Sequence, residues 1–234
     1  MRDRRFFALF VTVVALALLA ASGLKASAQS NQIPLLSDPL AGLKYDNRYE
    51  LYVGMGYARL IAGPTLIDGT SMGGLDIQGT RWMTRKWGLM ANVRTYYGNG
   101  RIIPNPYNVN YPLEMQHLFL AGPEYLGPHN KHAALTLHAV AGAAYGIFDT
   151  TLGTHDPTTG TPITLSTGQV GLFNSGVNFG AEVGGTIDLN RSPNWVFRIA
   201  PDLQLTNYQP VGGSGIQKNF AISVGAMYRF KKKR

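Results

Sequence analysis

Hydrophobic and polar residues alternate strictly in the segment 219–230. The residues of one face carry no charge and include aromatic rings at both ends: Phe220, Ile222, Val224, Ala226, Tyr228 and Phe230. A two-residue period predicts a β-strand whose two faces meet different environments. Tilted in a bilayer, such a strand spans about 25 Å, the height of the apolar band on a membrane barrel. A half-buried strand of a soluble sandwich would show the same alternation. The other segments are therefore needed to distinguish a membrane barrel from a soluble sandwich.

Seven earlier segments alternate in the same way, at residues 49–59, 74–83, 87–97, 113–126, 135–146, 176–189 and 195–206. The separators between the eight segments are alternately long and short. Membrane barrels have short periplasmic turns and long extracellular loops. The pattern therefore predicts an all-β fold, an eight-stranded antiparallel up-and-down transmembrane β-barrel. A lipocalin-type barrel is polar outside, whereas here the charges gather on the glycine-rich face and the nearly chargeless face ends in aromatic residues.

The N-terminal region predicts export. Arg2, Arg4 and Arg5 precede an uncharged run at 6–21, and Ala26-Ser27-Ala28 forms a small-x-small cleavage site. We interpret 1–28 as a signal peptide; a single membrane-anchoring helix is the alternative. The remaining divisions are an irregular periplasmic lead-in at 29–47, the barrel at 48–230 and a basic tail at 231–234.

Composition narrows the possible functions. The chain has 234 residues and no cysteine, which excludes disulfides and thiolate chemistry. Its formal charge is +8. Without residues 1–28, 17 Lys/Arg and 12 Asp/Glu remain, a net charge of +5 of which the basic tail supplies four. A nearly neutral body lacks the basic stripe that nucleic-acid binding requires.

The end of the last segment resembles the C-terminal insertion signal of the small outer-membrane β-barrel family, with OmpA-like, OmpX-like and porin-like members. The matching residues are Ser223, Gly225, Tyr228 and Phe230. The hairpin sequence from Gly184 to Leu189 adds to the likeness, which covers residues 49–230. In the family the aromatic residue is usually the last one, whereas here four basic residues follow. The resemblance implies a monomer in the cell outer membrane, with outer-membrane lipids, lipopolysaccharide and the barrel assembly machinery as partners.

Nine charged residues fall on the inward face of the predicted strands: Glu50, Asp76, Arg94, Glu124, Glu182, Asp188, Arg198, Asp202 and Arg229. They would form either a salt-bridged plug or the selectivity lining of a pore. An eight-stranded barrel is just wide enough for side chains to fill, which favours the plug. If 84–86 is a three-residue turn, Asp76 lies opposite Arg94. Closure of the barrel would place Glu50 beside Arg229.

The histidines would be the first sign of an enzyme. His138 faces inward on this reading, His129 and His132 lie in a turn, and His155 lies in a long loop. Their spacing indicates no metal site, and His138 has no serine two residues away to form a nucleophile–base pair. The sequence therefore predicts no catalytic residues, metal or cofactor.

These observations favour a non-enzymatic barrel with a structural, adhesive or binding role displayed on four extracellular loops. A narrow porin-like channel for small solutes is the alternative. A lipid-modifying enzyme would need a nucleophile–base pair at the rim of the barrel.

Overall fold

The computed structural model describes residues 38–64, 69–102, 104–107, 109–149, 154–209 and 215–230. The proposed signal peptide and basic tail lie outside these residues, and the lead-in is described from Asp38 onward. The described strands are β1 (Tyr49–Leu60), β2 (Thr70–Trp82), β3 (Trp87–Asn99), β4 (Leu113–His129), β5 (Ala133–Phe148), β6 (Gly176–Asn190), β7 (Trp195–Thr206) and β8 (Gln217–Phe230), with a 3₁₀ helix η1 (Thr167–Val170) between β5 and β6. Within this part of the chain, no helix has the length and apolarity needed to cross a membrane.

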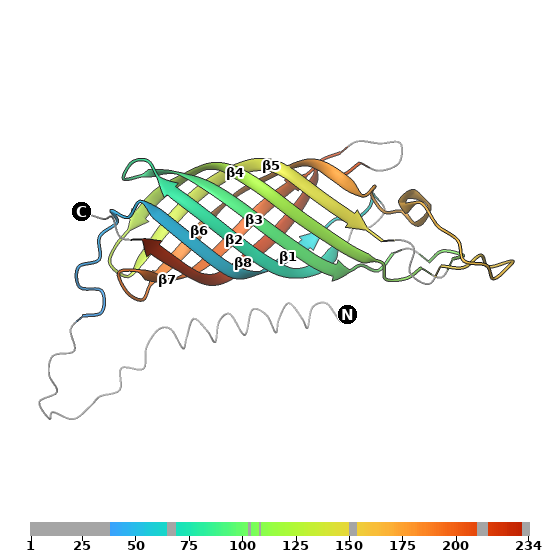
Figure 1. Cartoon of the computed structure of the whole chain (residues 1–234), viewed down its shortest axis with the longest axis horizontal. Coiled ribbons are helices and arrows are strands. Elements are labelled where there is room, and N and C mark those ends of the chain that lie inside the picture. The colour runs from blue at the N-terminus through green and yellow to red at the C-terminus, as the bar shows by residue number, and fades with distance from the viewer. Residues whose placement is uncertain are drawn as a thin grey trace, which may run out of the picture. The chain divides into compact units, whose positions relative to one another are not determined.

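Each strand pairs antiparallel with its neighbours, and β1 pairs with β8, so the eight strands form a closed up-and-down barrel (Figure 1). The predicted fold class is confirmed. Connections at one end, here called the short-turn end, comprise 83–86, 130–132 and 191–194. Connections at the opposite, long-loop end comprise 61–69, 100–112, 149–175 and 207–216.

The inside and outside of the wall follow the two-residue period. In β1, Leu51, Val53 and Met55 are exposed while Glu50 and Tyr52 are buried, and the same alternation recurs around the barrel. In water this exposed apolar surface would be costly. In a bilayer it faces lipid, and every strand N–H and C=O can still be paired because the barrel has no edge.

The register between β2 and β3 is the predicted one. Asp76 lies opposite Arg94 and Gln78 opposite Asn92. At the β1–β8 seam, Glu50 lies opposite Arg229 and Gly54 opposite Gly225. A Cβ atom added to Gly225 would overlap the carbonyl oxygen of Val53 and the Cα of Gly54, so the two strands approach more closely here than a side chain permits.

Two strand boundaries differ from the sequence-based prediction by three residues or more. β2 begins at Thr70 rather than 74, because Gly73 and Gly74 continue the ladder opposite Tyr97 and Tyr96 instead of ending it. A Cβ at Gly74 would overlap the carbonyl oxygen of Thr95, so glycine permits this close pairing.

β4 continues to His129, through residues expected to form a turn. The register shifts between Leu126 and His129, where β4 has one residue more than β5. A β-bulge absorbs such an extra residue and accommodates Pro128, which has no N–H to pair.

Candidate functional site

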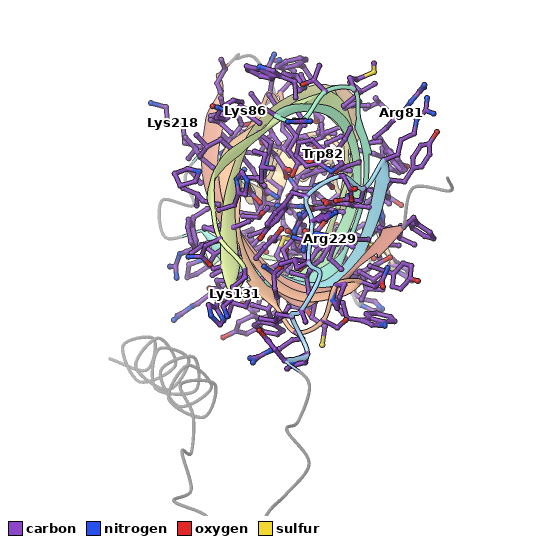
Figure 2. All side chains as sticks on the ribbon, turned by 90° about the vertical axis from the view of Figure 1, so that its left-hand side faces the viewer. Arg81, Trp82, Lys86, Lys131, Lys218 and Arg229 are labelled. Carbon is purple, nitrogen blue, oxygen red and sulfur yellow. The ribbon has the colours of Figure 1, made fainter. Side chains whose placement is uncertain are left out.

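The lumen is the candidate functional site, because the polar chemistry of the strands points into it. All nine inward charges named from the sequence lie in the lumen and are buried. They occupy its middle and its short-turn end. Viewed onto that end, Arg229 and Trp82 lie inside the ring of strands, whereas Arg81 and Lys131 lie outside it (Figure 2).

A central cluster surrounds the fully buried Arg94 of β3. Its Nη2 lies 3.1 Å from Asp76 Oδ2 and its Nη1 lies 3.4 Å from Glu182 Oε1, and Nη2 also donates to Asp202. His138 Nε2 lies 2.8 Å from the other oxygen of Asp202. The predicted Asp76–Arg94 ion pair is therefore present, within a wider cluster that joins five strands.

A mouth cluster lies nearer the short-turn end and contains Arg198 and Arg229. Arg198 binds both oxygens of Asp188, with Nε–Oδ1 2.7 Å and Nη2–Oδ2 3.0 Å. Glu50 lies between the arginines, 3.4 Å from Arg198 Nη2 and 3.4 Å from Arg229 Nε. The predicted Glu50–Arg229 pair is thus present at the seam. Glu124 accepts hydrogen bonds from Thr80 and Thr136 in this region.

Gln78 connects the two clusters. Its Nε2 donates to Asp76 Oδ2 at 2.8 Å, and its Oε1 accepts from Arg198 Nη1 at 3.2 Å. Nothing in the alternating pattern of the strand singles out Gln78 for this role. Asp76 also accepts a bond from Ser223, which in turn accepts one from Tyr52. The central and mouth clusters therefore form one continuous polar network across the barrel.

The long-loop end of the lumen is filled by different chemistry. Loop residues fold over the opening and pack on inward apolar strand residues; we call this the apolar cap. The loop members are Ala62, Ile102, Val109, Leu165, Val170, Leu172, Phe173 and Tyr208, and strand members include Leu60, Met72, Tyr96, Leu118 and Phe148. The threonine- and glycine-rich composition of 149–174 predicts a polar loop. That prediction is wrong for the second half of the segment, where Leu165, Val170, Leu172 and Phe173 are buried.

Three aromatic rings form the centre of the apolar cap. The Phe148 centroid lies 5.6 Å from that of Tyr208 and 6.3 Å from that of Phe173. Gln116 donates to the Tyr208 hydroxyl at 3.2 Å. Burial raises the pKa of Tyr208 to about 12, so this hydroxyl stays neutral in the cap.

Glu114 is a buried lumenal carboxyl that the sequence analysis did not name. It lies near the long-loop end of β4, two residues from the buried Gln116. The two-residue period would have placed Glu114 inward, because it lies an even number of residues from Glu124, which is one of the nine predicted inward charges.

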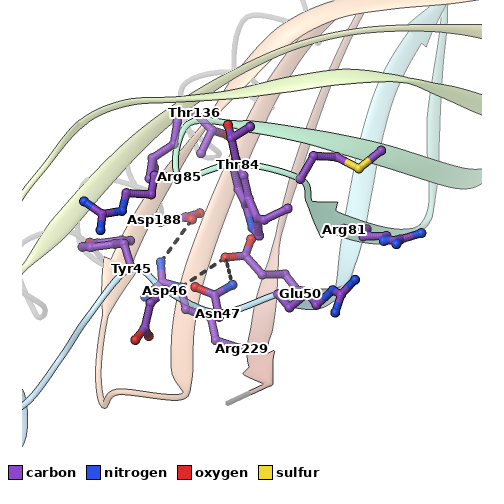
Figure 3. Close-up of a pocket in the computed structure, with 14 residues that line it drawn as sticks. Tyr45, Asp46, Asn47, Glu50, Arg81, Thr84, Arg85, Thr136, Asp188 and Arg229 are labelled. Atoms are coloured by element: carbon purple, nitrogen blue, oxygen red, sulfur yellow. Dashed lines mark hydrogen bonds and ion pairs between the residues drawn. The ribbon is translucent and has the colours of Figure 1, made fainter. Parts of the chain in front are cut away.

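The lead-in reaches back across the short-turn mouth. The Tyr45 ring lies 4.8 Å from the guanidinium carbon of Arg229. Its hydroxyl donates to the Asn130 carbonyl at 2.8 Å and accepts from Asn190 Nδ2 at 2.7 Å. Beside it lies a cavity of about 580 Å³ whose lining includes Glu50, Asp188 and Arg229 (Figure 3).

The histidine and serine side chains of the lumen take part in contacts with buried carboxylates. His138 contacts Asp202, and the Ser223 hydroxyl donates to Asp76. Within the described ranges, no group of three or more His, Asp or Glu side chains is arranged to hold a metal ion.

Known proteins resemble this chain in structure. No family model matches the sequence, and no curated protein does. Among solved structures, Neisserial surface protein A is 10% identical with a TM-score of 0.51, and the match covers 78% of this chain and 97% of that one. Ail of Yersinia pestis, solved with the heparin analogue sucrose octasulfate, is 16% identical with a TM-score of 0.48, covering 79% and 99%. OprG from Pseudomonas aeruginosa is 12% identical with a TM-score of 0.47, covering 80% and 97%.

The structural likeness to Neisserial surface protein A, at a TM-score of 0.51, shows a shared fold. The apolar outer wall independently requires a lipid surrounding, and closed antiparallel barrels of this kind span the bacterial outer membrane. The chain therefore has the fold of the small eight-stranded outer-membrane β-barrel proteins, and the outer membrane is its location.

Proposed function

We propose that this protein is a non-enzymatic outer-membrane barrel with a closed lumen, whose structural, adhesive or binding role is performed by its extracellular loops. The arginine clusters stabilise the middle and the short-turn end of the barrel. The apolar cap fixes the bases of the loops on the long-loop mouth. In this proposal the wall is a rigid support, and the parts of the loops outside the cap meet the partner.

The observation that carries the proposal is the filling of the lumen. An ion crossing the barrel would need a continuous wet path. That path would have to pass the mouth cluster, the central cluster around Arg94 and then the apolar cap. Buried apolar side chains such as Leu172 and Phe173 exclude water at the last of these steps.

Conductance in planar bilayers tests the proposal. We expect no steady unitary conductance from the unmutated protein, checked as folded by its heat-modifiable migration in gels. The matched variant Leu172→Ser/Phe173→Ser weakens the apolar cap while leaving the strands unchanged. A steady conductance from unmutated protein would show that the lumen is open and would reject the closed-barrel proposal.

A narrow channel is the second candidate, favoured by the cavity of about 580 Å³ at the short-turn mouth. Any conduction should favour cations. The described lumen buries seven carboxyl groups, Glu50, Asp76, Glu114, Glu124, Glu182, Asp188 and Asp202, against the arginines Arg94, Arg198 and Arg229. Anion-selective conductance would contradict this lining as the source of selectivity.

The partners expected from the resemblance belong to the same proposal: outer-membrane lipids, lipopolysaccharide and, during insertion, the barrel assembly machinery. Tyr228 and Phe230 of the insertion signal lie on the outer wall with ring centroids 4.9 Å apart, while Ser223 and Gly225 face the lumen. Both aromatic rings are thus available to a protein that approaches from the membrane side.

A further inference from the structure

The outer wall carries few charged residues. Among its described strand positions, Lys, Arg, Asp or Glu occurs at Arg59, Arg81 and Lys218. Arg59 and Lys218 lie toward the long-loop end, and Arg81 lies alone at the short-turn end. Arg81 pairs in register with Tyr49 on one side and Leu89 on the other, both about half exposed on the lipid-facing wall. A guanidinium at this position is stable only if it reaches the headgroup layer.

The guanidinium of a second arginine, Arg48, lies beside the ring of Tyr49. The guanidinium carbon of Arg48 lies 5.9 Å from the Tyr49 ring centroid. Arg48 and Arg81 are both exposed, and neither forms an ion pair with a carboxylate in the described part of the chain. Asp46 lies nearby but points away from Arg81 (Figure 3). Tyr49 thus has one arginine as its sequence neighbour and another as its cross-strand partner, and neither arginine has an ion-pair partner in the described part of the chain.

A cavity lies beside these two arginines at the short-turn end of the barrel. The cavity of about 580 Å³ is lined by Arg48, Arg81 and Met83 as well as by the lumenal residues of the mouth. It therefore extends from the mouth to the outer rim. A polar group attached to a membrane lipid could enter it while the acyl chains stay on the apolar wall.

We propose that Arg48, Tyr49 and Arg81 form a binding site for the phosphate of an anionic phospholipid in the leaflet at the short-turn end. Arginine forks bind phosphate oxygens with charge-assisted hydrogen bonds. Tyrosine is favoured at the headgroup level because its ring is apolar and its hydroxyl is polar. A zwitterionic lipid has the same phosphate, but its ammonium group cancels much of the attraction. Arg81 faces the lipid wall rather than the aqueous mouth, which favours a lipid over a soluble acidic protein.

Quenching of a nearby tryptophan tests this site. The chain has three tryptophans, and Trp87 lies on the outer wall two residues from Leu89, the register partner of Arg81. A Trp82→Phe/Trp195→Phe variant leaves Trp87 as the single reporter. It is reconstituted in mixed phosphatidylglycerol and phosphatidylcholine vesicles in which one or the other lipid is brominated. We expect a preference for phosphatidylglycerol near Trp87 of about fivefold to thirtyfold, since each basic residue near an anionic surface contributes roughly 1 kcal/mol and the site holds two.

Two double substitutions distinguish a specific lipid-binding site from general attraction of anionic lipid to the basic residues at the short-turn end. Arg48→Gln/Arg81→Gln should reduce the preference to near unity. Lys131→Gln/Arg191→Gln removes the same charge from the other two short turns and should leave it unchanged, with folding of every variant checked by heat-modifiable migration. Equal loss in both variants, or no preference in the reporter protein, would overturn the proposal. Bilayer conductance would reject the closed lumen without altering this result, so the two proposals fail separately.

Discussion

The two ends of the lumen are filled by different means. Toward the short turns, arginine clusters connect strands distant in sequence, such as β3 with β7 through Arg94 and Asp202. At the long-loop end, loop side chains pack on inward apolar residues, such as Phe173 on Tyr208. The charged filling depends on strand register, because each fork must meet its carboxylate. The apolar filling depends on tertiary packing of the loops, which tolerates many local geometries.

The largest expected effect concerns the charged filling. Arg94→Ala leaves Asp76, Glu182 and Asp202 buried without their shared cation. Breaking a buried pair by removing one partner costs about 3–5 kcal/mol. We expect a clear fall in the urea midpoint of unfolding in lipid, measured by gel migration. Arg85→Ala, in the exposed β2–β3 turn, is the control, and equal midpoints for the two variants would show that the central cluster contributes little.

The next effect is expected in the apolar cap. Phe173→Ala removes a buried ring and should cost about 3 kcal/mol. The loss should be local, because the strand ladder does not depend on this ring. Limited proteolysis should cleave the connection 149–175 faster while the urea midpoint of the barrel changes less. Thr158→Ala, an exposed substitution in the same connection, is the control. If Phe173→Ala is cleaved as slowly as this control, packing in the apolar cap does not keep the loop in place.

A smaller effect is expected where the lead-in crosses the mouth. Tyr45→Ala removes the ring over Arg229 and two hydrogen bonds, a loss of about 1–2 kcal/mol. Amide hydrogen exchange of residues 38–47 should quicken. Tyr45→Phe keeps the ring and should lie between Tyr45→Ala and the unmutated protein. Unchanged exchange in Tyr45→Ala would mean that the mouth is closed without this residue.

The smallest effect lies in the exposed part of the long loop. The Asp156 carboxylate accepts backbone hydrogen bonds from Thr158 at 2.7 Å and Thr159 at 3.1 Å, which lower the pKa of Asp156. A lowered pKa stabilises the turn at higher pH, and this contribution is lost as the pH falls below about 4 through the folded pKa. NMR signals of the two threonine amides should therefore shift in acid. Asp156→Asn should abolish that titration, and an identical shift in this variant would assign the effect elsewhere.

The charged half of the lumen was largely predictable from the sequence. The two-residue period of each strand placed Asp76 and Arg94 inward, and a three-residue turn set their register. Glu50 and Arg229 followed from closure alone. The first pair rests on geometry that one hairpin determines, and the second on the requirement that the first and last strands meet. The wider sharing of Arg94 by Glu182 and Asp202 did not follow, because it depends on the tilt of strands across the lumen.

The apolar cap was not predictable in the same way. Leu172 and Phe173 lie in a segment rich in threonine and glycine, with no period to indicate which side chains turn inward. Their burial depends on where the other loops return. The β4 extension was missed because Gly127 and Pro128 are also typical turn residues, and only the pairing with β5 shows the bulge.

The close approach of Gly54 and Gly225 bears on the step of folding in which β1 and β8 pair and close the barrel. Seven of the eight strand pairings join neighbours along the chain, whereas closure brings together residues such as Glu50 and Arg229, which are 179 positions apart. Tethering ends that distant costs chain entropy of about 5 kcal/mol by the logarithmic law for loops. The pairing with no hairpin to guide it has two glycines opposite each other near its centre, where side chains cannot obstruct the approach of the strands. The backbones of β1 and β8 can therefore pair at Gly54 and Gly225 before the neighbouring side chains are ordered.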